Sequence, residues 1–261
     1  MTRTLALLYG FLCYVVFLFA FVYAIGFVGN LVVPKSIDSG EAGAFWPSLL
    51  VNLGLLGLFA VQHSVMARPG FKRWWTRFVP EPVERSTYVL FASLALLLLY
   101  WQWRPLPEVV WSVDHEVGRA VVWAIFGLGW GLVLLSTFMI SHAHLFGVKQ
   151  VHAFWRRKQP ASPGFQTPGL YRHMRHPIMT GFLIAFWATP AMTVGHLVFA
   201  LATTGYILIA LQLEERDLIG AFGARYEAYR LRVPMFVPKP GRQPRTHETR
   251  REPVRLDAEH S

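Results

Sequence analysis

The chain has 261 residues, of which 54% are hydrophobic and 15% are charged, and its formal net charge is +10. Soluble domains carry about 25% charged residues, so this composition excludes an ordinary soluble protein and favours a membrane domain. The positive charge does not indicate a nucleic-acid partner, because the basic residues lie in loops between apolar runs. The lone Cys13 excludes an intrachain disulfide.

Six apolar segments follow one another along the chain, and roughly 20 apolar residues suffice to cross the hydrocarbon layer as a helix. A lipid-exposed backbone must satisfy its hydrogen bonds internally, so we expect all six to be helical. They cover Leu5–Val33, Trp46–Met66, Ser86–Trp103, Gly118–Ile140, Ile178–Met192 and Gly195–Leu213. The fifth is short and lies close to the sixth, so the two form either full spans or a re-entrant hairpin. The sequence therefore predicts an all-α, polytopic transmembrane helix bundle with five or six spans.

Basic residues gather in two of the connecting loops, and these loops fix the expected orientation. They are Arg68, Lys72, Arg73, Arg77 and Arg85 in one loop, and Lys149, Arg156, Arg157, Lys158, Arg172 and Arg175 in the other. Loops rich in Lys and Arg stay in the cytoplasm, so we expect both loops and the C-terminal segment to be cytoplasmic. Residues 1–238 form the predicted membrane domain. Residues 239–261, rich in Pro, Arg and Glu, are predicted to be a disordered charged tail.

Ionisable residues at membrane depth are costly and therefore indicate function, and one candidate group precedes the fifth segment. Arg175 and His176 come directly before Pro177, which suits the first turn of a helix. The start of a helix favours an anion such as a carboxylate. Gly181, one turn further, would let a flat ligand or another helix approach closely. The alternative is a basic loop that only follows the topology rule.

The second candidate group is the acid pair Glu214-Glu215 at the end of the last apolar segment. In an antiparallel hairpin these carboxylates come within reach of Arg175 and His176. A carboxylate there could hold an ammonium group or a ribose hydroxyl. The alternatives are simple solvation and charge pairing with the basic loop.

Three histidines form the third group, because His63, His142 and His144 all fall near the same ends of their segments. A histidine inside a membrane more often makes a helix–helix hydrogen bond than it acts in catalysis. His142 and His144 are two residues apart and point to different faces of a helix, so we predict no metal site. The sequence has no glycine-rich nucleotide loop and no Walker motif. A nucleotide cofactor would have to be held by the helical domain itself.

Two sets of motifs in this order resemble a known family of membrane enzymes. Arg175-His176-Pro177, Gly181, Glu214-Glu215 and Phe222-Gly223 with Tyr226, Tyr229, Val233 and Pro234 resemble the isoprenylcysteine carboxyl methyltransferases and related membrane methyltransferases. Gln62-His63-Ser64, Glu84-Arg85-Ser86-Thr87-Tyr88 and Leu145-Phe146-Gly147 resemble the nurim-like branch. Within that branch the chain is most similar to the bacterial methanethiol S-methyltransferases, over nearly everything except the tail.

This resemblance implies an enzyme that uses S-adenosyl-L-methionine to methylate methanethiol, a small thiol, to dimethyl sulfide. It also implies an integral protein of the bacterial inner membrane with its active site facing the cytoplasm. The partners that we expect are a small thiol substrate and the lipid bilayer, with no nucleic acid, and no obligate protein partner is evident from the sequence. The expected cofactor site comprises Tyr171, Arg175, His176, Pro177, Gly181, Glu214 and Glu215. Met179 stands where the family usually has Tyr. Ala210 stands where carboxyl-methylating relatives have an Arg, which suits a small neutral thiol better than a carboxylate.

A thiol must lose its proton before it can attack, because the thiolate is the nucleophile. His63, His142 or His144 is the expected base, since a neutral imidazole accepts a proton near pH 7. Arg175 could add a positive field. Three other functions remain open at this point: methylation of another thiol, lipid or isoprenylated acceptor, a non-enzymatic nurim-like role, and a small transporter. A transporter would predict an internal repeat with broken helices, and the sequence shows no convincing repeat.

Overall fold

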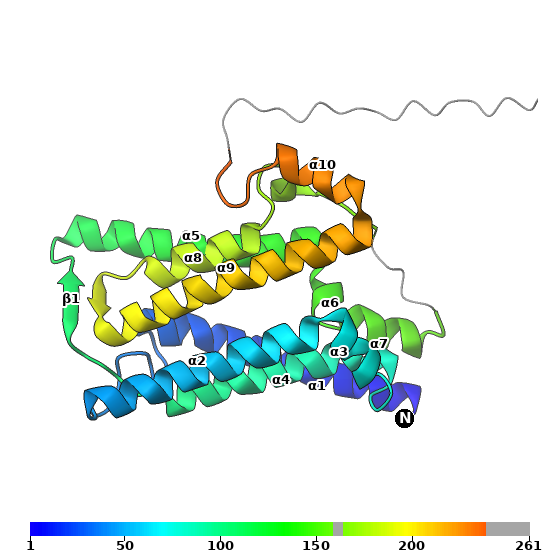
Figure 1. Cartoon of the computed structure of the whole chain (residues 1–261). Coiled ribbons are helices and arrows are strands. Elements are labelled where there is room, and N and C mark those ends of the chain that lie inside the picture. Colours follow the sequence, from blue (N-terminus) through cyan, green and yellow to red (C-terminus); the bar gives the residue numbers. More distant parts are fainter. Residues whose placement is uncertain (159–163, 239–261) are drawn as a thin grey trace, which may run out of the picture.

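The computed structural model describes residues 1–158 and 164–238, which form a bundle of mostly apolar helices (Figure 1). Within these described ranges, five helices are long and apolar enough to cross a membrane. They are α1 (Arg3–Gly29), α2 (Phe45–Ala67), α4 (Glu81–Gln102), α5 (Glu116–Ile140) and α9 (Val194–Phe222). Large apolar side chains such as Leu8, Phe11 and Leu128 remain exposed, as on helices that face lipid. The predicted all-α membrane bundle is confirmed. The predicted charged tail lies outside the described residues.

The helices form two layers (Figure 1). In one layer α4 lies between α1 and α2, and in the other α8 (Pro177–Trp187) lies between α5 and α9. We call the end at which α2, α5 and α9 finish the basic end. Shorter helices gather there: α3 (Pro69–Trp75), α6 (His142–Leu145), α7 (Val148–Trp155), the 3-10 turn η1 (Gly169–Arg172) and α10 (Ala224–Arg232).

At the opposite end, which we call the strand end, the structure differs from the prediction for the fifth apolar segment. Its helix, α8, stops at Trp187 rather than continuing to Met192. Pro190 lacks an N–H and disfavours helical backbone just before it. The chain instead continues extended into β2 (Ala191–Thr193), which pairs antiparallel with β1 (Val109–Ser112). The 11 residues of α8 rise about 16 Å, about half the hydrocarbon layer.

A buried aromatic core joins the two layers on the side of the strand end. Phe27 of α1 contacts Tyr100 and Trp103 of α4 and Phe199 of α9, with ring centroids 4.8, 6.0 and 6.3 Å apart. The Trp103 indole N–H is satisfied by the carbonyl of Ile37 at 3.0 Å. The contacts of Phe27 with Trp103 and Phe199 are edge-to-face, a geometry that adds to the free energy of burial. The core therefore holds the layers together at one end and leaves ionisable side chains to gather at the other.

Glycines bring α5 and α8 into backbone contact. A Cβ at Gly181 would lie 2.7 Å from the carbonyl oxygen of Gly129 and 2.8 Å from the backbone nitrogen of Val133. Small residues permit such close approach of helices in membranes. Of the two roles expected for Gly181, the structure thus shows the approach of another helix.

Replacing Gly181 with Ala is expected to destabilise the protein by about 1–3 kcal/mol, because the added methyl group forces two backbones apart. Thermal unfolding in detergent measures this change. Gly131→Ala in α5 is the control, because a Cβ there meets nothing within 4 Å. Equal unfolding temperatures for the two variants would contradict the proposed close contact.

Candidate active site at the basic end of the bundle

Glu215 is the centre of a buried charge cluster that joins α9 to the start of α8. Its side chain is 8% exposed. Its Oε1 lies 3.2 Å from Arg175 Nη2 and 3.0 Å from His176 Nε2, and Oε2 lies 3.9 Å from Arg230 Nη1. A buried carboxylate needs such partners to offset its lost hydration. The structure thus brings together the acid pair and the Arg-His-Pro turn, which the sequence placed far apart along the chain.

The segment after α10 fixes the Arg-His-Pro turn from outside. The backbone N–H of Arg175 donates to the carbonyl of Pro234 at 2.9 Å, and that of His176 donates to Met235 at 3.2 Å. The Tyr229 hydroxyl donates to the carbonyl of Tyr171 at 2.5 Å. Burial raises the pKa of Tyr229 to about 12, so this hydroxyl stays protonated at neutral pH. Pro177 begins α8 at its first turn, as the sequence predicts.

Glu214 lies in a different environment from its neighbour, because adjacent residues on a helix point about 100° apart. It is exposed and makes none of the ion pairs found among the described residues. Burial raises the pKa of the Tyr171 hydroxyl, and the nearby Glu214 carboxylate raises it further. The Tyr206 hydroxyl, two helical turns before Glu214 on the same side of α9, lies 3.3 Å from the Ser64 hydroxyl of α2, so this side of α9 faces the other layer. Glu214 is therefore an accessible carboxylate between the two layers.

His63 of α2 contacts a tyrosine of the neighbouring helix α4. The Tyr88 hydroxyl lies 2.9 Å from Nε2 and 3.0 Å from Nδ1 of His63. One hydroxyl cannot bond both ring nitrogens well at once, so one nitrogen remains for another partner. Phe59 stacks on the imidazole with centroids 5.2 Å apart, and the Arg85 guanidinium lies 5.0 Å from the centre of the Tyr88 ring. The arrangement holds an imidazole with one open nitrogen beside a cation.

The other two histidines have different surroundings. Both ring nitrogens of His142 are occupied, Nε2 by the Tyr14 hydroxyl and Nδ1 by the Thr137 hydroxyl, each at 2.9 Å. His144 makes one long ring contact, 3.5 Å from Nδ1 to Gln150 Nε2. Burial lowers the pKa of His144, and the positive charges of Arg85 and Lys149 lower it further. His142 thus joins helices, whereas His144 is a neutral imidazole at pH 7 with an available nitrogen.

Several hydrogen-bond donors near Glu215 are buried without an acceptor among the described residues. The Arg175 side chain is 9% exposed. Its Nε and Nη1 atoms, like the Tyr226 hydroxyl, are buried without a hydrogen-bond partner among the residues that the structure describes. An unpaired buried donor costs about 1–3 kcal/mol, so such groups usually mark a place for a ligand or water. A guanidinium with free N–H groups fits a carboxylate, and the open Glu214 carboxylate nearby fits an ammonium group or a hydroxyl.

Sequence reasoning singled out most of these charged residues but missed the tyrosines that surround them. Tyr88 and Tyr206 face the site from α4 and α9, and Tyr226 and Tyr229 from α10. They appeared in the sequence only as parts of a resemblance or as apolar-span residues. A hydroxyl-bearing aromatic side chain at the same depth as an intramembrane histidine is the signal that could have revealed Tyr88.

The fold and the site together define the class of protein: a helical integral membrane protein that gathers a carboxylate, an imidazole and a buried guanidinium at one end of an otherwise apolar bundle. Curated relatives then identify the family. The methanethiol S-methyltransferase of Mycobacterium tuberculosis is 60% identical over 242 residues, 93% of this chain and 99% of that protein. The methanethiol S-methyltransferase of Crocosphaera subtropica is 51% identical over 243 residues, 93% and 95% of the two chains.

A more distant likeness extends to an animal protein. Nurim of Bos taurus is 32% identical over 178 residues, 65% of this chain and 68% of nurim. No protein-family model and no solved structure matches the chain. The similarity to the bacterial proteins spans nearly the whole of both partners, so the chain belongs to the methanethiol S-methyltransferase family.

Proposed function

We propose that the protein transfers a methyl group from S-adenosyl-L-methionine to methanethiol and thereby forms dimethyl sulfide. The observation that carries this proposal is that the two neighbouring acids, Glu214 and Glu215, lie in different environments. Glu215 is bound in the buried cluster with Arg175 and His176, whereas Glu214 is exposed on the side of α9 that faces α2. A carboxylate suited to the cofactor and an imidazole suited to accept a proton thus lie at the same end of the bundle. The names of the curated relatives supply the substrate.

The cofactor has a carboxylate, an ammonium group and a ribose, and the site offers a partner for each. Arg175 donates to the carboxylate through its unpaired N–H groups, and Glu214 accepts from the ammonium or a ribose hydroxyl. Glu215 and His176 hold Arg175 in position rather than contact the ligand. Tyr171, Pro177 and Gly181 fix the turn and seat α8 against α5. When bound, the sulfonium supplies an electrophilic methyl carbon.

The protein's own residues then prepare the acceptor. The thiol proton passes to the open ring nitrogen of His63. The resulting thiolate sulfur would form the new bond to the methyl carbon as the bond between that carbon and the donor sulfur breaks, and S-adenosylhomocysteine, a neutral thioether, would leave. The Tyr88 hydroxyl orients the imidazole, and the Arg85 guanidinium nearby stabilises the developing thiolate. Apolar helix surfaces keep water out, so that donor and acceptor meet in a fixed alignment. No step requires a metal.

The basic end faces the cytoplasm of a bacterial inner membrane in this proposal. The loops at this end hold most of the Lys and Arg residues of the membrane domain, which supports a cytoplasmic location. Ala210 supports a thiol acceptor, because a small side chain there offers no cation to a substrate carboxylate. The methyl donor, a charged nucleotide derivative, would then enter from the cytoplasm.

Replacing Glu214 with Gln is expected to weaken S-adenosylmethionine binding by about 10- to 150-fold, the loss of a hydrogen bond to a charged group worth about 1.5–3 kcal/mol. Isothermal calorimetry on the purified protein in detergent measures the affinity. Glu227→Gln, at an exposed position of α10, is the matched control and should bind normally. Unchanged affinity in Glu214→Gln would contradict the cofactor assignment.

The activity itself is tested with cofactor labelled in its methyl group. Wild-type protein, labelled S-adenosylmethionine and methanethiol should release labelled dimethyl sulfide into the headspace. Failure of the wild-type protein to bind the cofactor at all would favour a non-enzymatic role. If the protein binds the cofactor and methylates another acceptor in a panel but not methanethiol, it is a methyltransferase with a different substrate.

A further inference from the structure

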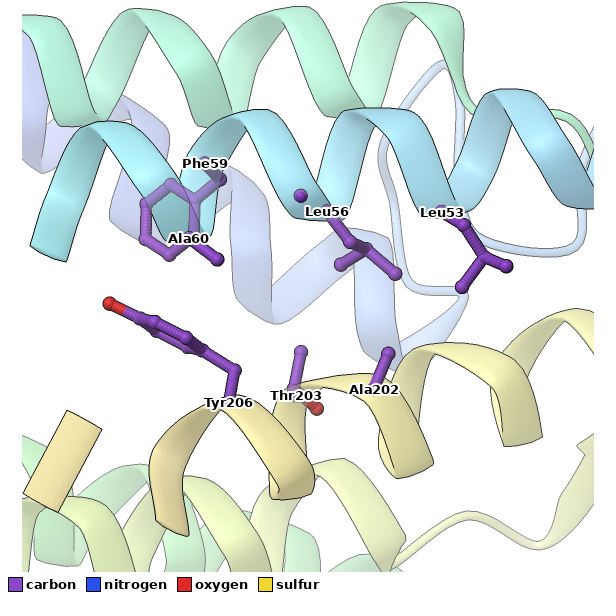
Figure 2. Close-up of a pocket in the computed structure, with 8 residues that line it drawn as sticks. Leu53, Leu56, Phe59, Ala60, Ala202, Thr203 and Tyr206 are labelled. Carbon is purple, nitrogen blue, oxygen red and sulfur yellow. The ribbon is translucent and has the colours of Figure 1, made fainter. Parts of the chain in front are cut away.

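An apolar cavity of about 230 Å³ lies between α2 and α9, where the two layers face one another (Figure 2). Figure 2 shows Leu56, Phe59 and Ala60 of α2 opposite Thr203 and Tyr206 of α9. The Thr203 hydroxyl donates to the carbonyl of Phe199 at 2.6 Å, so its methyl group is the part directed toward α2. The walls of the cavity are therefore almost wholly apolar.

One end of this cavity adjoins the candidate active site. The Ser64 hydroxyl lies 3.3 Å from the Tyr206 hydroxyl, and Phe59 contacts both the Tyr206 ring and the His63 ring, with centroids 6.1 and 5.2 Å apart. Residues four apart share one face of a helix, so Tyr206, Ala210 and Glu214 follow one another along the same side of α9. The Tyr206 end of the cavity thus lies beside His63, on the side of α9 that continues toward Glu214.

The two helices are tied together beyond the cavity, on the side of the basic end. Arg68 at the end of α2 forms an ion pair with Asp217 of α9, with 2.7 Å between Nη1 and Oδ2. At the other rim Leu53 remains 43% exposed on the lipid-facing side. The space is therefore bridged by charges toward the basic end, and on its flank it is bordered by an exposed apolar residue, as expected of a surface that faces lipid. A small apolar molecule can dissolve in lipid and enter from there.

We propose that the α2–α9 cavity holds the alkyl group of the thiol acceptor, with the sulfur toward Tyr206, and that the lack of a side chain at Gly57 leaves room for that group. The inference rests on the proposed function. An apolar cavity of about 150 Å³ suffices for a benzene molecule, so the observed volume admits methanethiol and alkyl thiols of a few carbons. Gly57 leaves this volume open, because a Cβ there would meet nothing within 4 Å. The tyrosine and serine hydroxyls mark the polar end, where the sulfur must meet the base.

Two substitutions change the cavity in opposite directions. Gly57→Leu fills it and is expected to lower kcat/KM for methanethiol at least about 10-fold, with a larger loss for longer thiols, since one methylene in an apolar pocket changes discrimination by about 10–200-fold. Leu53→Ala widens the lipid-side rim and should raise kcat/KM for butanethiol relative to methanethiol. Cofactor affinity should remain that of the wild-type protein in both variants, because neither residue belongs to the charge cluster.

The matched control is Gly54→Leu, which lies on the same helix, also has open space around a Cβ and does not line the cavity. It should keep wild-type rates for every thiol in the panel. If Gly57→Leu and Gly54→Leu behave alike while the wild-type protein is active, the cavity holds only lipid chains and the inference is overturned. If the wild-type protein methylates no thiol, the proposed function fails and this inference fails with it.

Discussion

Replacing Glu215 with Ala is expected to destabilise the protein by about 3–5 kcal/mol, the usual result of removing one partner from a buried ion pair. The carboxylate is the shared partner of Arg175 and His176, and both side chains are less than a tenth exposed. Without it, the guanidinium keeps its charge in a poorly hydrated place. The start of α8 also loses its tie to α9. Chemical unfolding in detergent, followed by tryptophan fluorescence, measures the change.

Substitutions at Glu214 and Glu215 distinguish the effect of removing a buried charge from the effect of removing an exposed acid. Glu214→Ala, one residue away but exposed, should change stability by no more than about 0.5 kcal/mol. Glu215→Gln keeps the shape and a hydrogen-bond acceptor, so its stability should fall between the two alanine variants. Equal stabilities for Glu215→Ala and Glu214→Ala would show that the charge cluster does not support the fold.

Replacing His63 with Gln is expected to lower kcat by about 10²–10⁴-fold, the usual contribution of a general base, with cofactor affinity unchanged. The pH dependence is the distinguishing measurement. An alkanethiol ionises only at alkaline pH, so without a base the rate should rise about 10-fold per pH unit until the thiol is ionised in solution. The wild-type protein should lack this steep rise, because His63 supplies the thiolate at neutral pH.

The two other histidines provide the comparison. His142→Gln removes hydrogen bonds to Tyr14 and Thr137, so we expect lower stability without the alkaline recovery of rate. His144 is the competing base, because its pKa is lowered by burial and by Arg85 and Lys149, and it is therefore neutral at pH 7. If His144→Gln shows the alkaline recovery and His63→Gln does not, the base is His144 and the assignment to His63 is wrong.

Helix content could be predicted from the sequence alone because its cause is local. A run of about 20 apolar residues has no stable alternative to a helix in a hydrocarbon layer, so five long helices appear where the apolar runs are. The ends of the helices were less predictable. α9 continues to Phe222 rather than ending near Leu213, because good helix formers such as Glu, Arg and Leu follow the apolar run. α8 ends early because β2 pairs with a strand from another loop.

The candidate site could be predicted only as a set of residue types. The sequence determined by itself that an Arg-His-Pro turn, an acid pair and a histidine lie near the same ends of apolar segments. Only the tertiary structure decided that Glu215 is buried against Arg175 whereas Glu214 stays open, and that Tyr88 meets His63. The physical reason is that the length of an apolar run determines whether its own segment forms a membrane helix. The partner of a charged or hydroxyl group depends instead on how each helix is rotated and on how distant segments pack together.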